Sequence, residues 1–129
     1  MVAVDTNIVV RLLTFDDRDQ AQRAERLFAA NGIFLPLTVL LETEWVLRRL
    51  YGVERERVTA ALRDLIALEN LHVEGEQVAR LALDWTDQGV DFADALHLAS
   101  SLEVGRFATF DVKLTRRAKR LSELDVIVP

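Results

Sequence analysis

The sequence contains no cysteine, which excludes disulfide bonds, zinc–thiolate sites and a thiol nucleophile. It also lacks any apolar run as long as the roughly 18 to 20 residues that a transmembrane helix needs. No basic segment precedes the apolar residues at its start, and Asp5 interrupts them, so a secretory signal is not expected. These absences together make a cytoplasmic location the expectation.

An excess of positive charge is missing as well. The chain carries 16 lysines and arginines against 21 aspartates and glutamates, for a net charge of −5 at pH 7. Such a balance argues against a protein that coats nucleic acid through a broad basic surface, although it permits nucleic-acid chemistry at a local site. The basic residues cluster in three places: Arg48 and Arg49; Arg55 and Arg57; and Arg116, Arg117, Lys119 and Arg120. Each cluster either pairs with acids on a solvated helix face or rims an acidic site, where arginine would match phosphate.

The 129 residues, of which 50% are hydrophobic, suit one domain with a single core. No internal repeat, low-complexity segment or linker interrupts residues 1–129. Short apolar segments alternate with helical patterns, which predicts a parallel sheet with helices on both faces. The expected strands are 1–4, 33–35, 71–73, 107–110 and 126–128, and the expected helices are about 6–13, 17–30, 37–51, 54–69, 76–87, 91–103 and 112–121.

Four acids lie next to or within apolar segments, where an unpaired charge would be energetically costly. Asp5 ends the first strand, Glu42 lies in the most apolar helix, Asp94 lies in the first turn of another apolar helix, and Asp111 ends the strand at 107–110. If the first and fourth strands are neighbours at the switch point of the sheet, their carboxyl ends share one crevice. Several carboxylates together require a cation, and oxygen ligands suit Mg²⁺ or Mn²⁺. Such an ion can generate a hydroxide nucleophile and neutralise a phosphodiester transition state.

Each of these acids also has a structural interpretation. Asp5 and Asp111 could cap the helices that follow them, and Asp91 is expected to be an N-cap. Glu42 could be a salt-bridged core acid, and Glu44 has equally apolar neighbours, so the pattern does not prefer one glutamate over the other. The coincidence of strand-end, helix-start and buried acids in one α/β chain is what favours a metal site.

The two histidines and the common motifs add little. His72 lies in a short apolar strand and is expected to be structural, and His97, three residues after Asp94, is expected to form a hydrogen bond rather than act as a general base. No phosphate-binding glycine loop, dinucleotide fingerprint or nucleophile elbow is present.

Four segments in order resemble the PIN-domain ribonucleases, and more specifically the VapC toxins of bacterial toxin–antitoxin modules. They read VDTN at 4–7, LETEWVL at 41–47, DFADAL at 91–96 and ATFD at 108–111, and the resemblance they carry extends in order over nearly the whole chain. The family acid lies three residues before the aromatic of the second segment, so the resemblance selects Glu42 over Glu44.

The resemblance implies a PIN-like three-layer α/β domain whose central five-stranded parallel sheet has the order 3-2-1-4-5. It implies cleavage of RNA by water with Mg²⁺ or Mn²⁺ as cofactor, and a DNA-binding antitoxin (VapB-like) as partner in a homodimer or hetero-oligomer. Asp5 and Asp94 would bind metal, Glu42 and Asp111 would complete the acidic pocket, Thr6, Asn7 and Thr109 would support them, and Arg48, Arg49, Arg116 or Arg117 would guide RNA. Many family members continue with Asp-x-Asp-Phe, whereas this chain reads Asp111-Val112-Lys113-Leu114, leaving one acid there.

Two alternatives stay open, one a different enzyme and the other a protein without catalytic activity. A metal-dependent phosphatase of haloacid-dehalogenase type would also use a strand-end aspartate, but Asn7 occupies the position of its second acid, and Lys113 is a poor candidate for its lysine. A non-catalytic partner-binding α/β domain is the other alternative, and the presence of all four acids argues against it.

Overall fold

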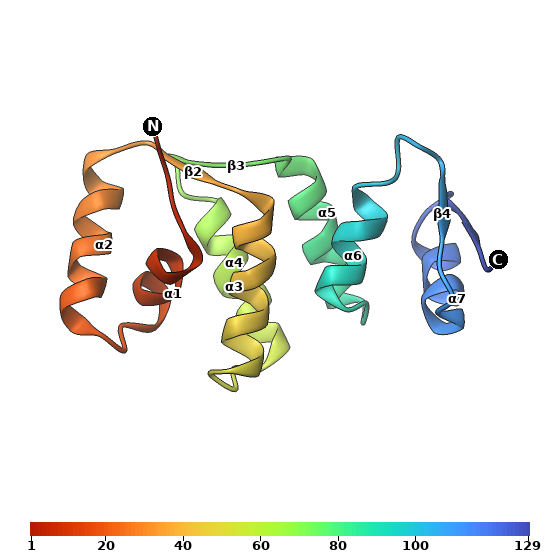
Figure 1. Ribbon diagram of the computed structural model, residues 1–129, viewed down its shortest axis with the longest axis horizontal. Coiled ribbons are helices and arrows are strands. Elements are labelled where there is room, and N and C mark those ends of the chain that lie inside the picture. The colour runs from red at the N-terminus through yellow and green to blue at the C-terminus, as the bar shows by residue number, and fades with distance from the viewer. The chain divides into compact units, whose positions relative to one another are not determined.

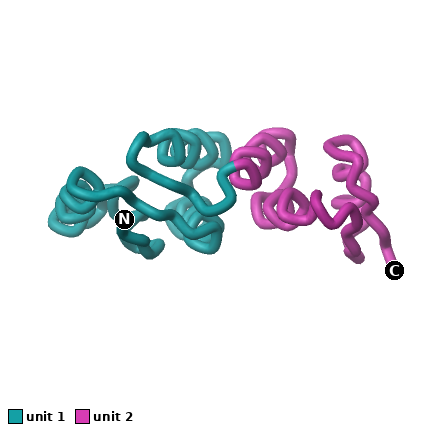
Figure 2. The backbone as a smooth tube through the Cα atoms, turned by 90° about the horizontal axis from the view of Figure 1, so that it is seen from above, with its two compact units in different colours: residues 1–76 teal, residues 77–129 magenta.

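The computed structural model describes residues 1–129 as two compact units, Met1–Glu76 and Gln77–Pro129 (Figure 2). The single domain that the sequence predicts would contain both units and stays a prediction. None of the helices is both long and apolar enough to cross a membrane.

Three short strands and four helices make up the first unit (Figure 1). In chain order they are β1 (Val2–Ala3), α1 (Thr6–Thr14), α2 (Arg18–Ala30), β2 (Ile33–Leu35), α3 (Leu37–Arg49), α4 (Arg55–Ile66) and β3 (Leu71–Val73).

The strands of this unit form a parallel sheet in the order β1-β2-β3. Ile33 of β2 pairs with both Val2 and Leu71, which aligns the three strands side by side. Ile33 and Leu35 are completely buried, so the central strand contributes directly to the core. This arrangement confirms the 3-2-1 part of the predicted strand order.

The first two helices pack against each other through small and branched side chains. Val9, Ala21 and Ala24 are almost completely buried. Phe15 takes a left-handed backbone conformation (φ 55°) where α1 ends, and Asp17 then caps α2 by accepting a hydrogen bond from the Gln20 amide at 3.0 Å. This turn directs α2 back along α1.

Helices α3 and α4 pack together as the predicted helical hairpin. Gly52, with φ +66°, lies in the connection, where a residue with a Cβ would be strained. Leu40 and Leu62, on α3 and α4, are completely buried. Helix α4 ends at Ile66, three residues before the predicted end.

The second unit consists of α5 (Glu76–Asp87), α6 (Phe92–Ala99), β4 (Arg106–Ala108), α7 (Val112–Leu121) and β5 (Asp125–Ile127). Strands β4 and β5 are parallel, with Phe107 opposite Val126, and α7 packs on β5. This pairing confirms the 4-5 part of the predicted order. The remaining β1–β4 neighbourhood would join the two units and stays a prediction.

Two boundaries in this unit differ by more than one residue from those predicted. Helix α6 ends at Ala99 rather than at residue 103, and the Ser101 hydroxyl donates to the His97 carbonyl oxygen at 2.7 Å where the helix stops. Serine side chains compete with the backbone in this way and weaken a helix end. Strand β4 ends at Ala108 rather than at residue 110, so Asp111 follows the strand by three residues instead of ending it.

Candidate active site

Asp5 lies just past the carboxyl end of β1, where the chain turns into α1. Its Oδ1 atom accepts a hydrogen bond from the Thr6 amide at 2.7 Å, and its side chain remains exposed. The preceding Val4 is buried and its amide donates to the Phe34 carbonyl at 3.2 Å, which anchors this turn to β2. Asp5 therefore caps α1, as its structural interpretation predicted, while its other carboxylate oxygen remains free to bind a ligand.

Glu42 of α3 lies beside this turn. The Thr6 hydroxyl donates to Glu42 Oε1 at 2.5 Å, so a buried threonine at the start of α1 orients an acid 36 residues away. The Glu42 side chain is exposed, so Glu42 is not the salt-bridged core acid of its structural interpretation. The contact brings together two of the acids that the resemblance selected, Asp5 and Glu42.

The buried acid of α3 is Glu44. Its side chain is 3% exposed, and its Oε2 accepts a hydrogen bond from Arg48 Nε at 2.9 Å, one helical turn further along. The salt-bridged acid that the pattern anticipated is thus Glu44, whereas Glu42 faces outward. The two glutamates differ because only Glu42 is on the helix face toward Thr6.

A small pocket of about 300 Å³ forms around the Asp5–Glu42 pair. Its polar lining includes the exposed amide of Asn7 and the guanidinium-bearing side chain of Arg11. The lining residues are Asp5, Thr6, Asn7, Val10, Arg11, Glu42 and Val46. Carboxylates, a hydroxyl, an amide and one cation therefore meet at this end of the first unit.

Sequence reasoning missed Arg11, because it stands alone rather than in an arginine cluster. The signal that could have identified it is its spacing of four residues from Asn7, which places both side chains on one face of α1. Arg11 Nε donates to Gln20 Oε1 at 2.8 Å, and its Nη1 donates to Asp16 Oδ1 at 3.2 Å. The Tyr51 hydroxyl lies 3.2 Å from the same Nη1. Arg11 is consequently held in one orientation by partners from three parts of the chain.

Asp16 accepts hydrogen bonds from three side chains, those of Arg11, Thr14 and Tyr51. The Tyr51 hydroxyl donates to its Oδ2 at 2.5 Å, and the Thr14 hydroxyl donates to its Oδ1 at 2.9 Å. The hydrogen bond from Tyr51, then that from Thr14, and the nearby charge of Arg11 lower the pKa of Asp16 below its ordinary value. Asp16 is therefore charged at neutral pH and stabilises the positive charge of Arg11.

In the second unit, Asp94 lies in the first turn of α6. Asp91 caps this helix by accepting a hydrogen bond from the Asp94 amide at 3.3 Å, as predicted. Burial raises the pKa of Asp94 above its ordinary value, the charges of Asp91 and Asp111 raise it further, and His97 opposes them. The charges of Asp94 and Asp111 therefore repel each other.

Asp111 caps α7 through a hydrogen bond from the Leu114 amide to its Oδ1 at 3.0 Å. Its own amide donates to the Thr109 hydroxyl oxygen at 3.0 Å. Thr109 therefore fixes the backbone from which Asp111 projects, and the Asp111 carboxylate is exposed. The capping interpretation is correct for Asp111, and one of its carboxylate oxygens remains free for another partner.

Within either unit, no three His, Asp or Glu side chains are grouped closely enough to hold a metal ion. The structure brings Asp5 together with Glu42 in the first unit, and places Asp94 within electrostatic reach of Asp111 in the second. Both pairs offer carboxylate oxygens, and hydroxyl or amide oxygens lie beside them. Donors of this kind match the preferences of Mg²⁺ and Mn²⁺.

The four arginines expected to guide RNA have different environments. Arg48 is paired with Glu44, and Arg117 Nη1 donates to the Gly89 carbonyl at 2.5 Å. Arg49 and Arg116 are exposed. His72, expected to be structural in an apolar strand, is instead exposed between two buried neighbours.

Comparison with known proteins identifies the family. Residues 2–120 match the PIN domain, and the chain therefore belongs to the PIN-domain family. No curated protein matches the sequence.

Solved structures similar to the chain include two from toxin–antitoxin systems. VapC20 of Mycobacterium tuberculosis, described as a sarcin–ricin loop cleaving toxin, is 21% identical with a TM-score of 0.46, over 97% of this chain and 99% of that one. VapBC2 of Rickettsia felis, bound to a DNA fragment from their promoter, is 18% identical with a TM-score of 0.41, over 99% of this chain and 98% of that one.

Proposed function

We propose that this PIN-domain protein is a Mg²⁺- or Mn²⁺-dependent endoribonuclease that hydrolyses phosphodiester bonds in RNA, and that it is the toxic component of a cytoplasmic toxin–antitoxin module. The observation that carries the proposal is the hydrogen bond from Thr6 to Glu42, which holds an acid of α3 beside Asp5 at the end of β1. Membership of the PIN-domain family and the four resembling segments support the same assignment.

In this proposal Asp5 and Asp94 bind the metal, and Glu42 and Asp111 complete the acidic set. A divalent cation held by these residues would supply Lewis acidity, which would make water more acidic and offset charge on the scissile phosphate. The chemistry of the donors fits this role, since hard cations select carboxylate oxygens. One oxygen of Asp5 is occupied by the Thr6 amide, which fixes the direction of the other.

The remaining residues of the site position these groups. Thr6 directs the Glu42 carboxylate through its hydroxyl, and Thr109 supports the backbone of Asp111. The exposed amide of Asn7 can donate to a phosphate oxygen of the RNA, and Arg11 supplies a positive charge at the rim of the pocket. Because the protein as a whole is acidic, its affinity for RNA is local and falls as salt concentration rises.

The decisive experiment compares two variants that both convert a helix-capping aspartate to asparagine. Asp5→Asn should abolish RNA cleavage by purified protein with Mn²⁺, and should abolish toxicity on induced expression. Asp17→Asn, which alters the α2 cap away from the pocket, should leave both unchanged. Equal activity in the two variants would contradict the site, and release of phosphate from small phosphomonoesters without RNA cleavage would favour the phosphatase alternative.

A DNA-binding antitoxin is the partner that this function requires, and we propose that it forms a hetero-oligomer with the protein, which is otherwise a homodimer. A short open reading frame directly upstream of the gene would encode it. Co-expression of that frame should suppress toxicity. The two products should elute together from a sizing column, and light scattering should give a mass larger than that of either protein alone. Toxicity that persists under co-expression would contradict the assignment.

A further inference from the structure

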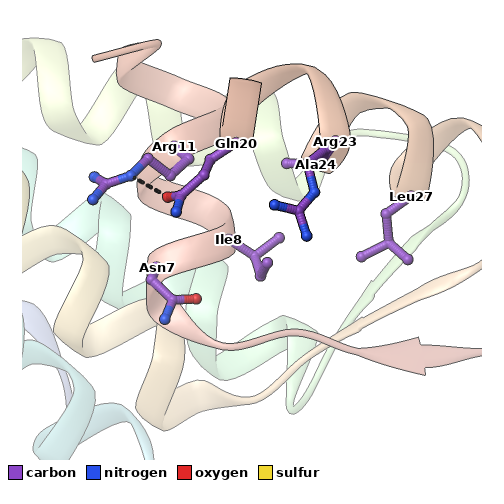
Figure 3. Close-up of a pocket in the computed structure, with 7 residues that line it drawn as sticks. All are labelled: Asn7, Ile8, Arg11, Gln20, Arg23, Ala24 and Leu27. Carbon is purple, nitrogen blue, oxygen red and sulfur yellow. Dashed lines mark hydrogen bonds between the residues drawn. The ribbon is translucent and has the colours of Figure 1, made fainter. Parts of the chain in front are cut away.

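A second, larger pocket lies between α1 and α2, next to the acidic one (Figure 3). It has a volume of about 500 Å³, within the roughly 300 to 1,000 Å³ range of small-molecule sites. Asn7 and Arg11 line both pockets, so the two are adjacent along α1. We call the second pocket the α1–α2 groove; it is lined by Asn7, Ile8, Arg11, Gln20, Arg23, Ala24 and Leu27.

The groove combines an apolar floor with a polar rim. Ile8, Ala24 and Leu27 provide the floor. In Figure 3 the Arg23 guanidinium lies over the groove and faces Ile8, while Leu27 lies at one end and the Arg11–Gln20 pair at the other. An apolar surface beside two cations can accept the face of a base together with its phosphates.

The two arginines offer phosphate contacts of different kinds. Arg11 is held by Gln20 and Asp16, so little conformational freedom is lost when it binds an anion. Arg23 is two-thirds exposed and pairs with Asp19 only at 3.6 Å, one helical turn away. Such an exposed pair is weak, so a phosphate can displace Asp19 from Arg23.

Gln20 adds a group that can contact a base edge. Its amide oxygen accepts the hydrogen bond from Arg11 Nε, which identifies this atom as the oxygen and directs the NH₂ group elsewhere. An NH₂ donor beside an apolar floor can meet an acceptor on a base.

We propose that the α1–α2 groove is the subsite for a nucleotide adjacent to the scissile phosphate. The base lies on Ile8 and Leu27, Gln20 donates to its edge, and Arg11 and Arg23 hold the flanking phosphates. This inference rests on the proposed function for its substrate, RNA. A single strand is favoured over an acidic peptide because the groove adjoins the acidic pocket at Asn7 and Arg11, so a strand that crosses the acidic pocket would extend into the groove.

The test measures binding rather than cleavage. A labelled single-stranded oligoribonucleotide is titrated, without divalent metal, against Asp5→Asn protein, and affinity is read by fluorescence anisotropy. Adding Arg23→Ala should weaken binding about tenfold, as expected for loss of a charged contact. The matched control is Arg18→Ala, which removes the same charge from the same helix at an exposed position that lines neither pocket. Equal losses in the two variants would overturn the subsite.

Two further probes test the chemistry of the ligand. An oligomer of the same length that lacks its bases should bind severalfold more weakly, and equal binding would show that the floor contacts no base. A poly-aspartate peptide should bind weakly and without dependence on Arg23; Arg23-dependent binding of the peptide but not of RNA would make the groove a protein-docking site and overturn the proposal.

Kinetics separate failure of this inference from failure of the proposed function. In metal-loaded protein with wild-type Asp5, Arg23→Ala should raise KM about tenfold with kcat unchanged, because the contact is equal in ground and transition states. If wild-type protein cleaves no RNA, the proposed function fails, while the binding comparison still decides whether the groove recognises a single strand.

Discussion

Thr6 and Glu42 are 36 residues apart in the sequence and are joined by a hydrogen bond of 2.5 Å between Thr6 Oγ1 and Glu42 Oε1. Thr6 is buried and Glu42 is exposed, so the threonine is the fixed partner and the carboxylate is the group that it orients. The acidic pocket of the first unit depends on this contact, since it holds an acid of α3 next to the cap of α1.

Removal of the Thr6 hydroxyl should therefore impair the site without removing any acid. Thr6→Val keeps the shape of the side chain, and should reduce RNA cleavage by about 10- to 100-fold, the usual effect of losing a group that orients a metal ligand. Thr6→Ser, which retains the hydroxyl, should lose much less activity. A thermal unfolding curve for each variant checks that the fold persists, and unchanged cleavage in Thr6→Val would show that Glu42 needs no such support.

Glu42 and Glu44 should respond in opposite ways to the same substitution. Glu44→Gln weakens a largely buried ion pair with Arg48, and should lower the free energy of unfolding by about 1 to 3 kcal/mol while RNA cleavage is retained. Glu42→Gln affects an exposed side chain, and should change stability by less than about 0.5 kcal/mol while cleavage is lost. Urea denaturation and a cleavage assay on both variants test this pair, and a reversed pattern would reassign the functional acid of α3 to Glu44.

The raised pKa of Asp94 has a consequence for stability. A carboxyl group whose folded-state pKa lies above its unfolded value binds its proton more tightly when folded, so its charged form opposes folding. The contribution of Asp94 to the free energy of unfolding is fully present below the pKa that Asp94 has in the unfolded chain. It is lost as pH rises through the pKa that Asp94 has in the folded protein. In metal-free buffer, Asp94→Asn should therefore stabilise the protein at pH 7 and have little effect near pH 3. Urea denaturation at the two pH values measures this; destabilisation at pH 7 would mean that the charged group has a favourable partner.

The influence of Asp111 on Asp94 can be checked by a pH titration. Asp111→Asn removes one of the two acidic neighbours that raise the pKa of Asp94, and should bring that pKa closer to its ordinary value. Burial and the charge of Asp91 remain, so the return should be partial. The chemical shift of the Asp94 carboxyl carbon as a function of pH reports the change. An unaltered titration midpoint would show that the charge of Asp111 does not affect Asp94.

Asp16 provides a prediction with the opposite sign. Its lowered pKa means that its charged form favours folding, so its contribution is present above the unfolded pKa and is lost as pH falls through the folded pKa. Tyr51→Phe removes the largest cause and should raise the pKa of Asp16 toward its ordinary value. An NMR titration of the carboxyl carbon measures the shift, and Tyr51→Phe should leave the pKa of Asp94 unchanged as an internal control.

The sequence by itself determined the elements whose causes are local. The caps at Asp91 and Asp111 involve an amide three residues away, so their residue types and positions predict them. The helix at 112–121 and the strands at 33–35 and 71–73 have the predicted bounds, because apolar periodicity within each segment decides its structure. Helix α6 ends before the predicted residue 103, because the Ser101 hydroxyl binds the His97 carbonyl oxygen, to which a backbone amide would otherwise donate if the helix continued.

The tertiary structure decided what depends on distant parts of the chain. Pattern alone could not distinguish Glu42 from Glu44, and only the packing of α3 against α1 shows that one meets Thr6 while the other is buried against Arg48. Arg11 carries no local signature beyond its spacing from Asn7, and its role appears only when α1, α2 and the end of α3 converge around it. Side chains that far apart in sequence become neighbours through burial of the apolar faces of their helices, which composition and periodicity do not specify in space.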